Sequence, residues 1–147
     1  MTTTAPLADA RALGLAHYAA RAVLETVLAR HSATFPQNIT LRLVTVAEAP
    51  LEREELVAQV VGSLKVDSAH ARGVVEELIA KGLLAAEESR IRATDAGRAF
   101  YAEVSAESAE FSARIWGGIP EEDLAAAGRV LTLVTQRANA ELAALSA

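Results

Sequence analysis

Residues 64–84 read LKVDSAHARGVVEELIAKGLL, and this segment is the most informative part of the chain about its fold. Asp67 carries an acceptor side chain of the kind preferred at a helix N-cap, and Gly82 is placed to end that helix. The apolar spacing predicts a helix buried on one face, formed by Val74, Val75, Leu78 and Ile79. The preceding segment 52–61 is also amphipathic and is expected to end as a helix at Gly62. Helix, short turn and helix is the spacing of a helix-turn-helix.

The residues after Gly82 predict a wing. Segments 83–87 and 90–93 flank Glu88-Ser89, which indicates a very short hairpin. Thr94 is then placed to cap a further helix. A helix-turn-helix followed directly by a hairpin is a winged helix.

Three long helices are expected outside this region. They run from about Leu7 to His31, from Asp95 to about Trp116, and from Pro120, taken as a first helical position, to the C-terminal region. Their apolar faces are too wide for one neighbour, so we expect them to pack against a second copy of the chain. The alternative is a helical bundle within one chain. The expected contacts between copies are Leu13, Val23, Val27, Leu124, Leu131, Val134, Leu142 and Leu145.

The predicted fold class is therefore mostly α: a winged helix-turn-helix with long N- and C-terminal dimerisation helices. Residues 1–34 are expected to form the N-terminal dimerisation helix, 35–98 the winged helix-turn-helix region and 99–147 the C-terminal dimerisation helices, in one compact domain. The segment 39–46 is ambiguous, because it combines β-branched residues and alternation with a place between proline-bounded helices. Local rules alone predict a strand there.

Composition excludes several classes of function. The chain has 147 residues, a net charge of -5 and no cysteine, which excludes disulfides, a thiolate nucleophile and cysteine-ligated zinc. The start, MTTTAPLADA, lacks the features of a signal peptide, and no apolar run approaches the ~20 residues of a membrane span. We expect a cytoplasmic protein with no membrane partner.

Enzyme chemistry is not expected. The three histidines are scattered without ligand spacing, and no glycine-rich phosphate loop is present. No metal, cofactor or catalytic residue is therefore predicted.

Taken in order, these motifs resemble those of the MarR family of bacterial transcription regulators. Residues 64–84 resemble the family's turn, recognition helix and closing phrase, here Leu78-Ile-Ala-Lys-Gly-Leu-Leu84. Ala93-Thr-Asp-Ala-Gly97 resembles the start of its long helix after the wing, and Ile119-Pro-Glu-Glu-Asp-Leu124 the opening of its last helix. The resemblance implies a helix for 39–46 and a homodimeric, ligand-responsive repressor. It also implies recognition helices in the DNA major groove of a pseudo-palindromic operator.

Two groups of candidate DNA contacts follow. Residues on the open face of the recognition helix, near its start, are expected to contact bases: Ser68, Ala69, His70 and Arg72. A second group is expected to contact phosphates: Lys65, Arg90, Arg92 and Arg98. The alternatives are an ion pair of Arg72 with Glu76, and neutralisation of Arg90 and Arg92 by Glu87 and Glu88.

Two departures from the family pattern support an alternative function. The wing is short and acidic, Glu87-Glu-Ser-Arg90, and Gly73 stands where the family usually has an arginine. The alternative is a winged-helix dimer with weak or lost DNA binding that acts through protein partners.

Charge by region favours DNA binding of low non-specific affinity. The segment from Glu52 to Arg98 contains seven basic and nine acidic residues, whereas the segment from Ala99 onward contains three basic and seven acidic residues. Most of the acidity therefore lies outside the expected DNA-contacting region. By family resemblance, a small aromatic or anionic effector is expected at His17, Tyr18, Arg21 and Arg42.

Overall fold

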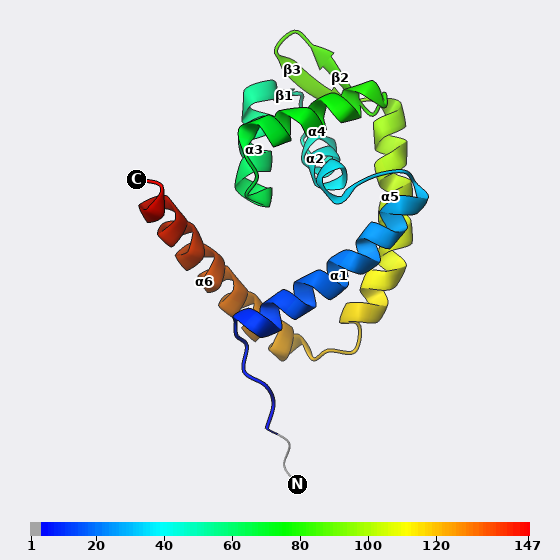
Figure 1. The fold of residues 1–147 in the computed structure, drawn as a ribbon. Coiled ribbons are helices and arrows are strands. Elements are labelled where there is room, and N and C mark those ends of the chain that lie inside the picture. The colour runs from blue at the N-terminus through cyan, green and yellow to red at the C-terminus, as the bar shows by residue number, and fades with distance from the viewer. Residues whose placement is uncertain (1–3) are drawn as a thin grey trace. The chain divides into compact units, whose positions relative to one another are not determined.

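A computed structural model gives the fold of residues 4–147 (Figure 1). The described residues form, in order, α1 (Ala10–Arg30), α2 (Phe35–Thr45), β1 (Leu51–Glu52), α3 (Arg53–Leu64), α4 (Ser68–Ala80), β2 (Leu84–Glu87), β3 (Arg90–Ala93), α5 (Asp95–Trp116) and α6 (Glu121–Leu145). This mostly helical winged helix-turn-helix confirms the predicted fold class. The chain divides into two compact units, the first ending at Phe111 and the second spanning Ser112–Ala147.

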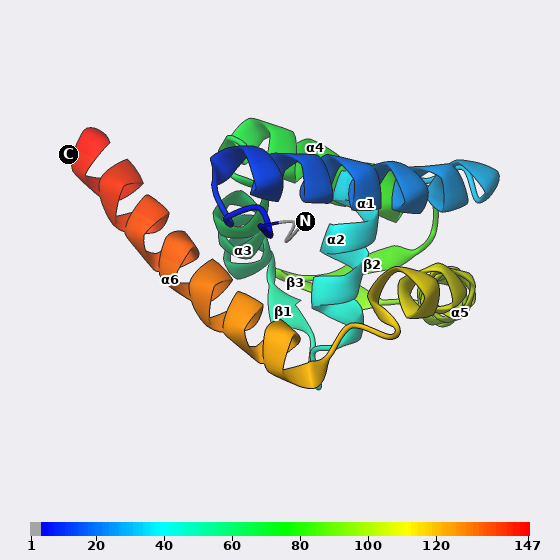
Figure 2. The same cartoon turned by 90° about the horizontal axis from the view of Figure 1, so that it is seen from below.

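α2 lies at the centre of the first unit, where it contacts α1, α3, α4 and β3 (Figures 1 and 2). The strand that local rules predict for 39–46 is wrong, and the helix implied by the family resemblance is right. Thr34 and Gln37 form a reciprocal capping box that starts the helix. Its buried side chains recur at helical spacing: Gln37, Thr40, Leu41 and Val44. Burial of this stripe outweighs the local β propensity.

The helix-turn-helix is formed by α3 and α4. α3 continues through Gly62 to Leu64, so the end predicted at Gly62 is wrong, and Lys65 follows in the left-handed region at φ 56°. The prediction for Asp67 is confirmed, since its carboxylate accepts a hydrogen bond from the His70 backbone N–H at 2.7 Å. The cap fixes where α4 begins and therefore which residues form its first turn.

The wing is an antiparallel hairpin of β2 and β3, joined by Glu88-Ser89 as predicted. A two-residue strand that the sequence did not reveal, β1, pairs with the other side of β3 and gives the order β1-β3-β2. Its register places Leu51 opposite Ile91, whose side chain is fully buried. β1 therefore attaches the start of α3 to the wing.

The start of α5 packs closely on the wing. Thr94 accepts a hydrogen bond from the Gly97 backbone N–H at 2.9 Å, which confirms the predicted cap. Gly97 is buried, and a Cβ there would lie 2.0 Å from the carbonyl oxygen of Leu83. Only glycine allows this approach of helix and backbone.

The hydrophobic core of the first unit joins α2, α3, α4 and the sheet. Its buried members are Leu41, Val44, Leu56, Val57, Val60, Ala71, Val74, Val75, Leu78, Leu83, Leu84, Ile91 and Ala93. α1 contributes Val27 and Leu28, which are 1 % and 0 % exposed. Val27 is thus already covered within one chain, whereas Leu13, another predicted contact between copies, is 41 % exposed.

α6 forms most of the second unit, and none of its 25 residues is buried. Pro120 precedes it at the N-cap, one position before the first helical residue, so its predicted place inside the helix is wrong by one. Six large apolar side chains of α6 are exposed: Val130, Leu131, Leu133, Val134, Leu142 and Leu145. None of the described helices combines the length and apolarity that a membrane span needs.

Candidate nucleic-acid interface

α4 has one buried and one exposed face. Ala71, Val74, Val75 and Leu78 are buried and anchor the helix in the core. The four residues predicted to contact bases are all exposed on the first two turns: Ser68, Ala69, His70 and Arg72. The predicted buried face is confirmed for Val74, Val75 and Leu78, whereas Ile79 is only partly buried and the buried Ala71 was not predicted.

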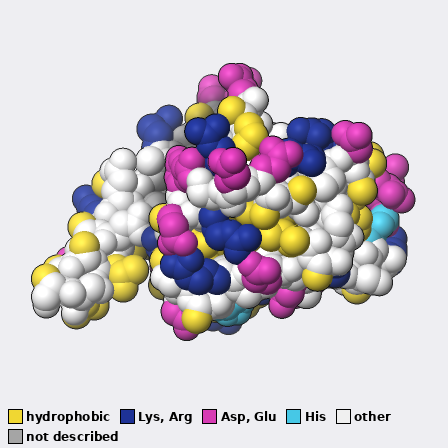
Figure 3. All heavy atoms as spheres, turned by 90° about the horizontal axis from the view of Figure 1, so that it is seen from above, with side chains coloured by type: hydrophobic (Ala, Val, Ile, Leu, Met, Phe, Trp, Pro, Cys, Tyr) yellow, Lys and Arg dark blue, Asp and Glu magenta, His cyan; other side chains and the backbone are white. Residues whose placement is uncertain are grey.

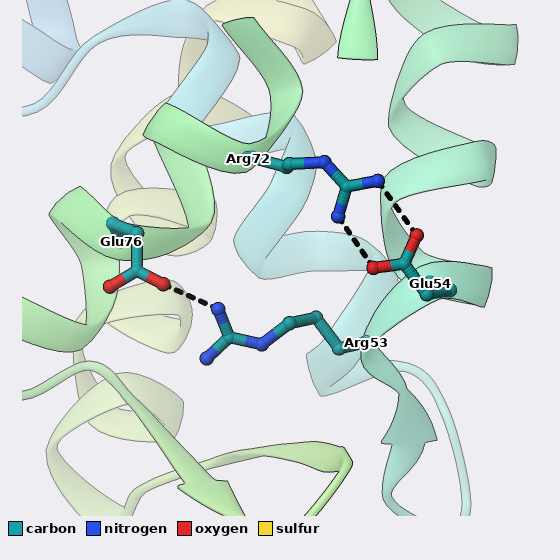
Figure 4. A network of polar contacts seen from close by, with 4 residues as sticks. All are labelled: Arg53, Glu54, Arg72 and Glu76. Carbon is teal, nitrogen blue, oxygen red and sulfur yellow. Dashed lines mark hydrogen bonds and ion pairs between the residues drawn. The ribbon is translucent and has the colours of Figure 1, made fainter. Parts of the chain in front are cut away.

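Arg72 is held by a carboxylate of α3. Its Nη1 and Nη2 atoms donate to the two oxygens of Glu54 at 2.5 and 2.8 Å (Figure 4). The hydrogen bond from Arg72 lowers the pKa of Glu54, and the same hydrogen bond raises the pKa of Arg72. The alternative prediction of an ion pair with Glu76 is wrong in its partner, because Glu54 takes that place.

Glu76 instead pairs with Arg53, the first residue of α3. Figure 4 shows the two arginines pointing in opposite directions, Arg72 from α4 to α3 and Arg53 from α3 to α4. The Arg53 backbone N–H also donates to the Ser89 carbonyl oxygen in the wing, at 2.8 Å. Sequence reasoning missed Arg53 and Glu54, since partners 23 and 18 residues away in the chain leave no local spacing signal.

The wing arginines are also paired. Arg90 donates to Glu52 of β1 at 3.0 Å, and Arg92 donates to Glu87 across the hairpin at 2.5 Å. A hydrogen bond from Ser89, followed by the one from Arg90, lowers the pKa of Glu52. The predicted neutralisation is therefore confirmed for Arg92 and Glu87, while Arg90 takes a partner from the strand that the sequence did not reveal.

The remaining candidate cations differ in their surroundings. Arg98 lies 3.6 Å from Asp95 on the first turn of α5. Lys65 is exposed at the turn between α3 and α4, and no carboxylate of the described chain pairs with it. Figure 3, which looks down on the sheet end of Figure 1, shows basic side chains lying beside acidic ones. The surface is thus patterned by paired charges.

A polar network holds the C-terminal end of α4. Gln37, which is 6 % exposed, donates from Nε2 to Glu77 at 2.8 Å. Lys81 Nζ donates to the Gln37 side-chain oxygen at 3.0 Å and to the Ser32 carbonyl oxygen at 2.5 Å. These contacts tie the end of the predicted recognition helix to the connection between α1 and α2.

A second polar cluster joins the end of α1 to α5. Glu107 accepts a hydrogen bond from Arg30 at 2.6 Å and pairs with His31 Nε2 at 2.8 Å. The contact with His31, followed by that with Arg30, lowers the pKa of Glu107. The His31 ring also packs edge-on to Phe100, with centroids 5.9 Å apart.

The predicted effector residues are only partly brought together. His17 and Tyr18 are neighbours on α1 with ring centroids 5.7 Å apart. The Arg21 guanidinium lies 4.2 Å from the centroid of the Phe35 ring and also pairs with Glu25. Arg42 is exposed on α2. Within residues 4–147, no three His, Asp or Glu side chains are grouped as a metal site requires.

The sequence matches no protein-family model, and no curated protein matches it significantly. The fold, however, is that of solved MarR-family regulators. A MarR-family transcriptional regulator from Rhodococcus sp. RHA1 aligns with a TM-score of 0.71 and 19% identity, over 84% of this chain and 90% of that one.

Two further solved structures are similar. CouR from Rhodococcus jostii RHA1, bound to p-coumaroyl-CoA, aligns with a TM-score of 0.72 and 18% identity, over 84% of this chain and 88% of its own. BpsR from Bordetella bronchiseptica, whose DNA binding is regulated by 6-hydroxynicotinic acid, aligns with a TM-score of 0.67 and 21% identity, over 89% and 99% of the two chains.

Proposed function

We propose that this chain is a MarR-like transcription regulator that binds double-stranded DNA in the cytoplasm as a homodimer and represses until a small ligand releases it. The supporting observation is the exposed face on the first two turns of α4, in a winged helix-turn-helix fold shared with solved regulators. Arginine can read guanine through two acceptors in the major groove, and serine can bond to several bases. Arg72 and Ser68 are therefore the strongest candidates for base contact, with Ala69 and His70 beside them.

The phosphate contacts are proposed at Lys65, Arg90, Arg92 and Arg98. Lys65 lies on the turn before α4, Arg90 and Arg92 lie on β3, and Arg98 lies on the first turn of α5. Phosphate contacts set the register of a protein on DNA and carry no base information. Each of the three arginines already lies beside a carboxylate, whose negative charge offsets part of its attraction to phosphates, so we propose that non-specific affinity is low.

Homodimer formation is supported by uncovered apolar side chains. Leu13 on α1 is 41% exposed, and the six exposed apolar residues of α6 are between 41% and 83% exposed. A long helix with such a face is stable in water when a partner covers it. We assign this partner as a second copy, with Leu13, Val23, Leu124, Leu131, Val134, Leu142 and Leu145 in the contact.

The DNA-binding proposal is tested by fluorescence anisotropy with the chain's own upstream DNA across a range of salt concentrations. Arg72→Ala is expected to cost ~1–3 kcal/mol and to relax one base preference, whereas Arg90→Ala is expected to weaken binding to all sequences and to lower the salt slope by about 1. No salt-dependent binding at low ionic strength contradicts the regulator proposal.

The effector proposal rests on the aromatic and cationic side chains His17, Tyr18, Arg21 and Arg42. Two of the similar regulators are described with ligands that contain an aromatic ring, p-coumaroyl-CoA and 6-hydroxynicotinic acid. We expect benzoate, as a simple aromatic anion, to weaken the DNA complex, and Arg21→Gln to reduce this response. A complex that is unaffected by benzoate and by the Arg21 change contradicts an aromatic-anion effector at this place.

A second candidate function is supported by the charge pairing itself. Because Arg53, Arg72, Arg90 and Arg92 each already contact a carboxylate, a winged-helix dimer that acts through protein partners also agrees with this surface. The same anisotropy measurement separates the two functions, since a protein-partner module shows no salt-dependent DNA binding.

A further inference from the structure

Four arginines of the winged region are paired with acidic side chains of that region. Arg72 pairs with Glu54, Arg53 with Glu76, Arg90 with Glu52 and Arg92 with Glu87. The pairs connect residues of α3, α4, β1 and the hairpin, and three of the four arginines, Arg72, Arg90 and Arg92, are proposed DNA contacts.

The ion pair of Arg72 with Glu54 differs from the ion pair of Arg53 with Glu76 in the exposure of its arginine and in its backbone contacts. Arg72 and Glu54 have 47% and 71% of their side chains exposed, and the two residues contact each other through their charged ends. Arg53 is 33% exposed, and its backbone is also bonded to Ser89 in the wing. The guanidinium of Arg72 is therefore the more exposed of the two, and it can leave Glu54 without breaking a backbone hydrogen bond.

We propose that Glu54 is an intramolecular competitor for Arg72, so that base recognition by Arg72 is an exchange of one bidentate acceptor for another. This inference rests on the proposed function, DNA binding through α4. It assigns Glu54, on the helix before the recognition helix, as the residue that sets how readily Arg72 is released to DNA.

The chemistry of the two acceptors makes the exchange specific. The planar guanidinium presents two parallel N–H donors, and Glu54 satisfies both with its two oxygens at 2.5 and 2.8 Å. Guanine offers the same two-point pattern through O6 and N7 in the major groove. A base that does not present two acceptors on its major-groove edge cannot replace both hydrogen bonds between Arg72 and Glu54. Arg72 then stays paired with Glu54.

The competition lowers DNA affinity by the free energy of the pair. In the free protein Arg72 is bound to Glu54, and in the complex that ion pair is broken. The free energy of the ion pair is therefore subtracted from the free energy that the base contact contributes to DNA binding. An exposed ion pair is worth little, so the subtraction corresponds to a few-fold change in affinity. Glu54 also leaves a negative charge beside phosphates in every complex, an effect that does not depend on Arg72.

The test is a double-mutant cycle of Glu54→Gln and Arg72→Ala, measured on a duplex that the wild-type protein selects from a random-sequence pool. Glu55→Gln is the matched control, because Glu55 is exposed on the same turn of α3 and accepts a 3.5 Å hydrogen bond from Gln59 rather than one from an arginine. It removes the same charge without releasing an arginine. Thermal unfolding of each variant checks that the fold is retained.

The expected result is that Glu54→Gln tightens binding by about 1.5- to 5-fold more than Glu55→Gln does, the range that an exposed pair's stabilisation converts to. In the Arg72→Ala background this excess is expected to vanish, because no pair remains to be broken. A merely structural role of Glu54 does not produce this dependence on Arg72.

Two results overturn the inference, and they are distinguishable. If the wild-type protein selects and binds DNA but Glu54→Gln and Glu55→Gln behave alike in both backgrounds, Glu54 does not compete for Arg72 and the proposed function stands. If the wild-type protein and all variants show no salt-dependent binding to any selected duplex, the proposed function fails and the inference fails with it.

Discussion

Two glycines show how sharply single positions of this chain differ. Gly97 lies where α5 meets the backbone of Leu83, whereas Gly73 lies on the exposed face of α4, where a Cβ would have no atom within 4 Å. The same residue type thus serves close packing at one site and leaves open space at the other.

Gly97→Ala is expected to destabilise the protein by about 1–3 kcal/mol, because its Cβ would lie 2.0 Å from a backbone carbonyl oxygen that cannot move alone. Gly73→Ala is the matched change, and it is expected to stabilise the protein by ~0.5–1 kcal/mol through helix propensity. Urea denaturation measures both. Two variants with shifts of the same sign contradict this account of Gly97.

Glu107 is expected to give the stability a dependence on acid pH. Its pKa is held below the ordinary value of 4.5 by His31 and Arg30, so its contribution is fully present above pH 4.5 and is lost as the pH falls through the lowered pKa. Wild type is therefore expected to be more stable than Glu107→Gln at neutral pH, with a difference that shrinks below pH 4.5.

Glu110→Gln is the control for this prediction, because Glu110 is an exposed carboxylate on the same helix. Thermal unfolding of the three proteins at several pH values makes the comparison. A difference between wild type and Glu107→Gln that stays constant with pH shows that the ionised carboxylate is not its source.

Among the elements, α4 depends on contacts at both ends. Asp67 caps its start, and Gln37 and Lys81 hold its end against the connection between α1 and α2. Side chains on the first two turns can be presented to DNA reproducibly only when the helix has a fixed start and a fixed end.

Asp67→Ala is expected to lower the free energy of unfolding by ~1 kcal/mol, because the His70 backbone N–H loses its acceptor. Asp67→Asn keeps an acceptor at the same place and is expected to change stability by only a few tenths of that amount. Urea denaturation of the two variants separates loss of the cap from loss of the charge. An equal loss in both assigns the effect to the charge.

At the scale of the whole molecule, many of the exposed large apolar side chains lie on α6. None of the 25 residues of α6 is buried, and apolar side chains recur along the helix at three- and four-residue spacing. The charge of the chain is also unevenly distributed along the sequence, since the residues from Ala99 onward include three basic and seven acidic side chains. We infer that this end of the chain serves assembly and that the less acidic winged region is left for DNA.

Leu131→Glu is expected to convert a dimer into a monomer, because it places a charge in the apolar stripe formed with Leu124, Val134 and Leu142. Gln136→Glu adds the same charge on the opposite, polar side of α6 and is expected to leave the dimer intact. Sedimentation equilibrium measures both masses. A wild-type protein that sediments as a monomer contradicts the homodimer proposal.

Elements whose signals are local could be predicted from the amino-acid sequence. The N-caps at Asp67 and Thr94, the hairpin around Glu88-Ser89 and the buried stripe of α4 all follow from the neighbouring residues, and the structure confirms them. These features depend on hydrogen bonds and periodicity within a few residues, so an isolated sequence contains the information that specifies them.

Features that depend on contacts between distant residues became visible only in the folded chain. Residues 39–46 belong to helix α2 and its C-cap because Thr40, Leu41 and Val44 are buried at the centre of the first unit. Packing there outweighs the local β propensity. Strand β1 exists only through its pairing with β3. The partner of Arg72 is Glu54 on another helix rather than Glu76 one turn away, because the approach of α3 and α4 brings together charges that are 18 residues apart.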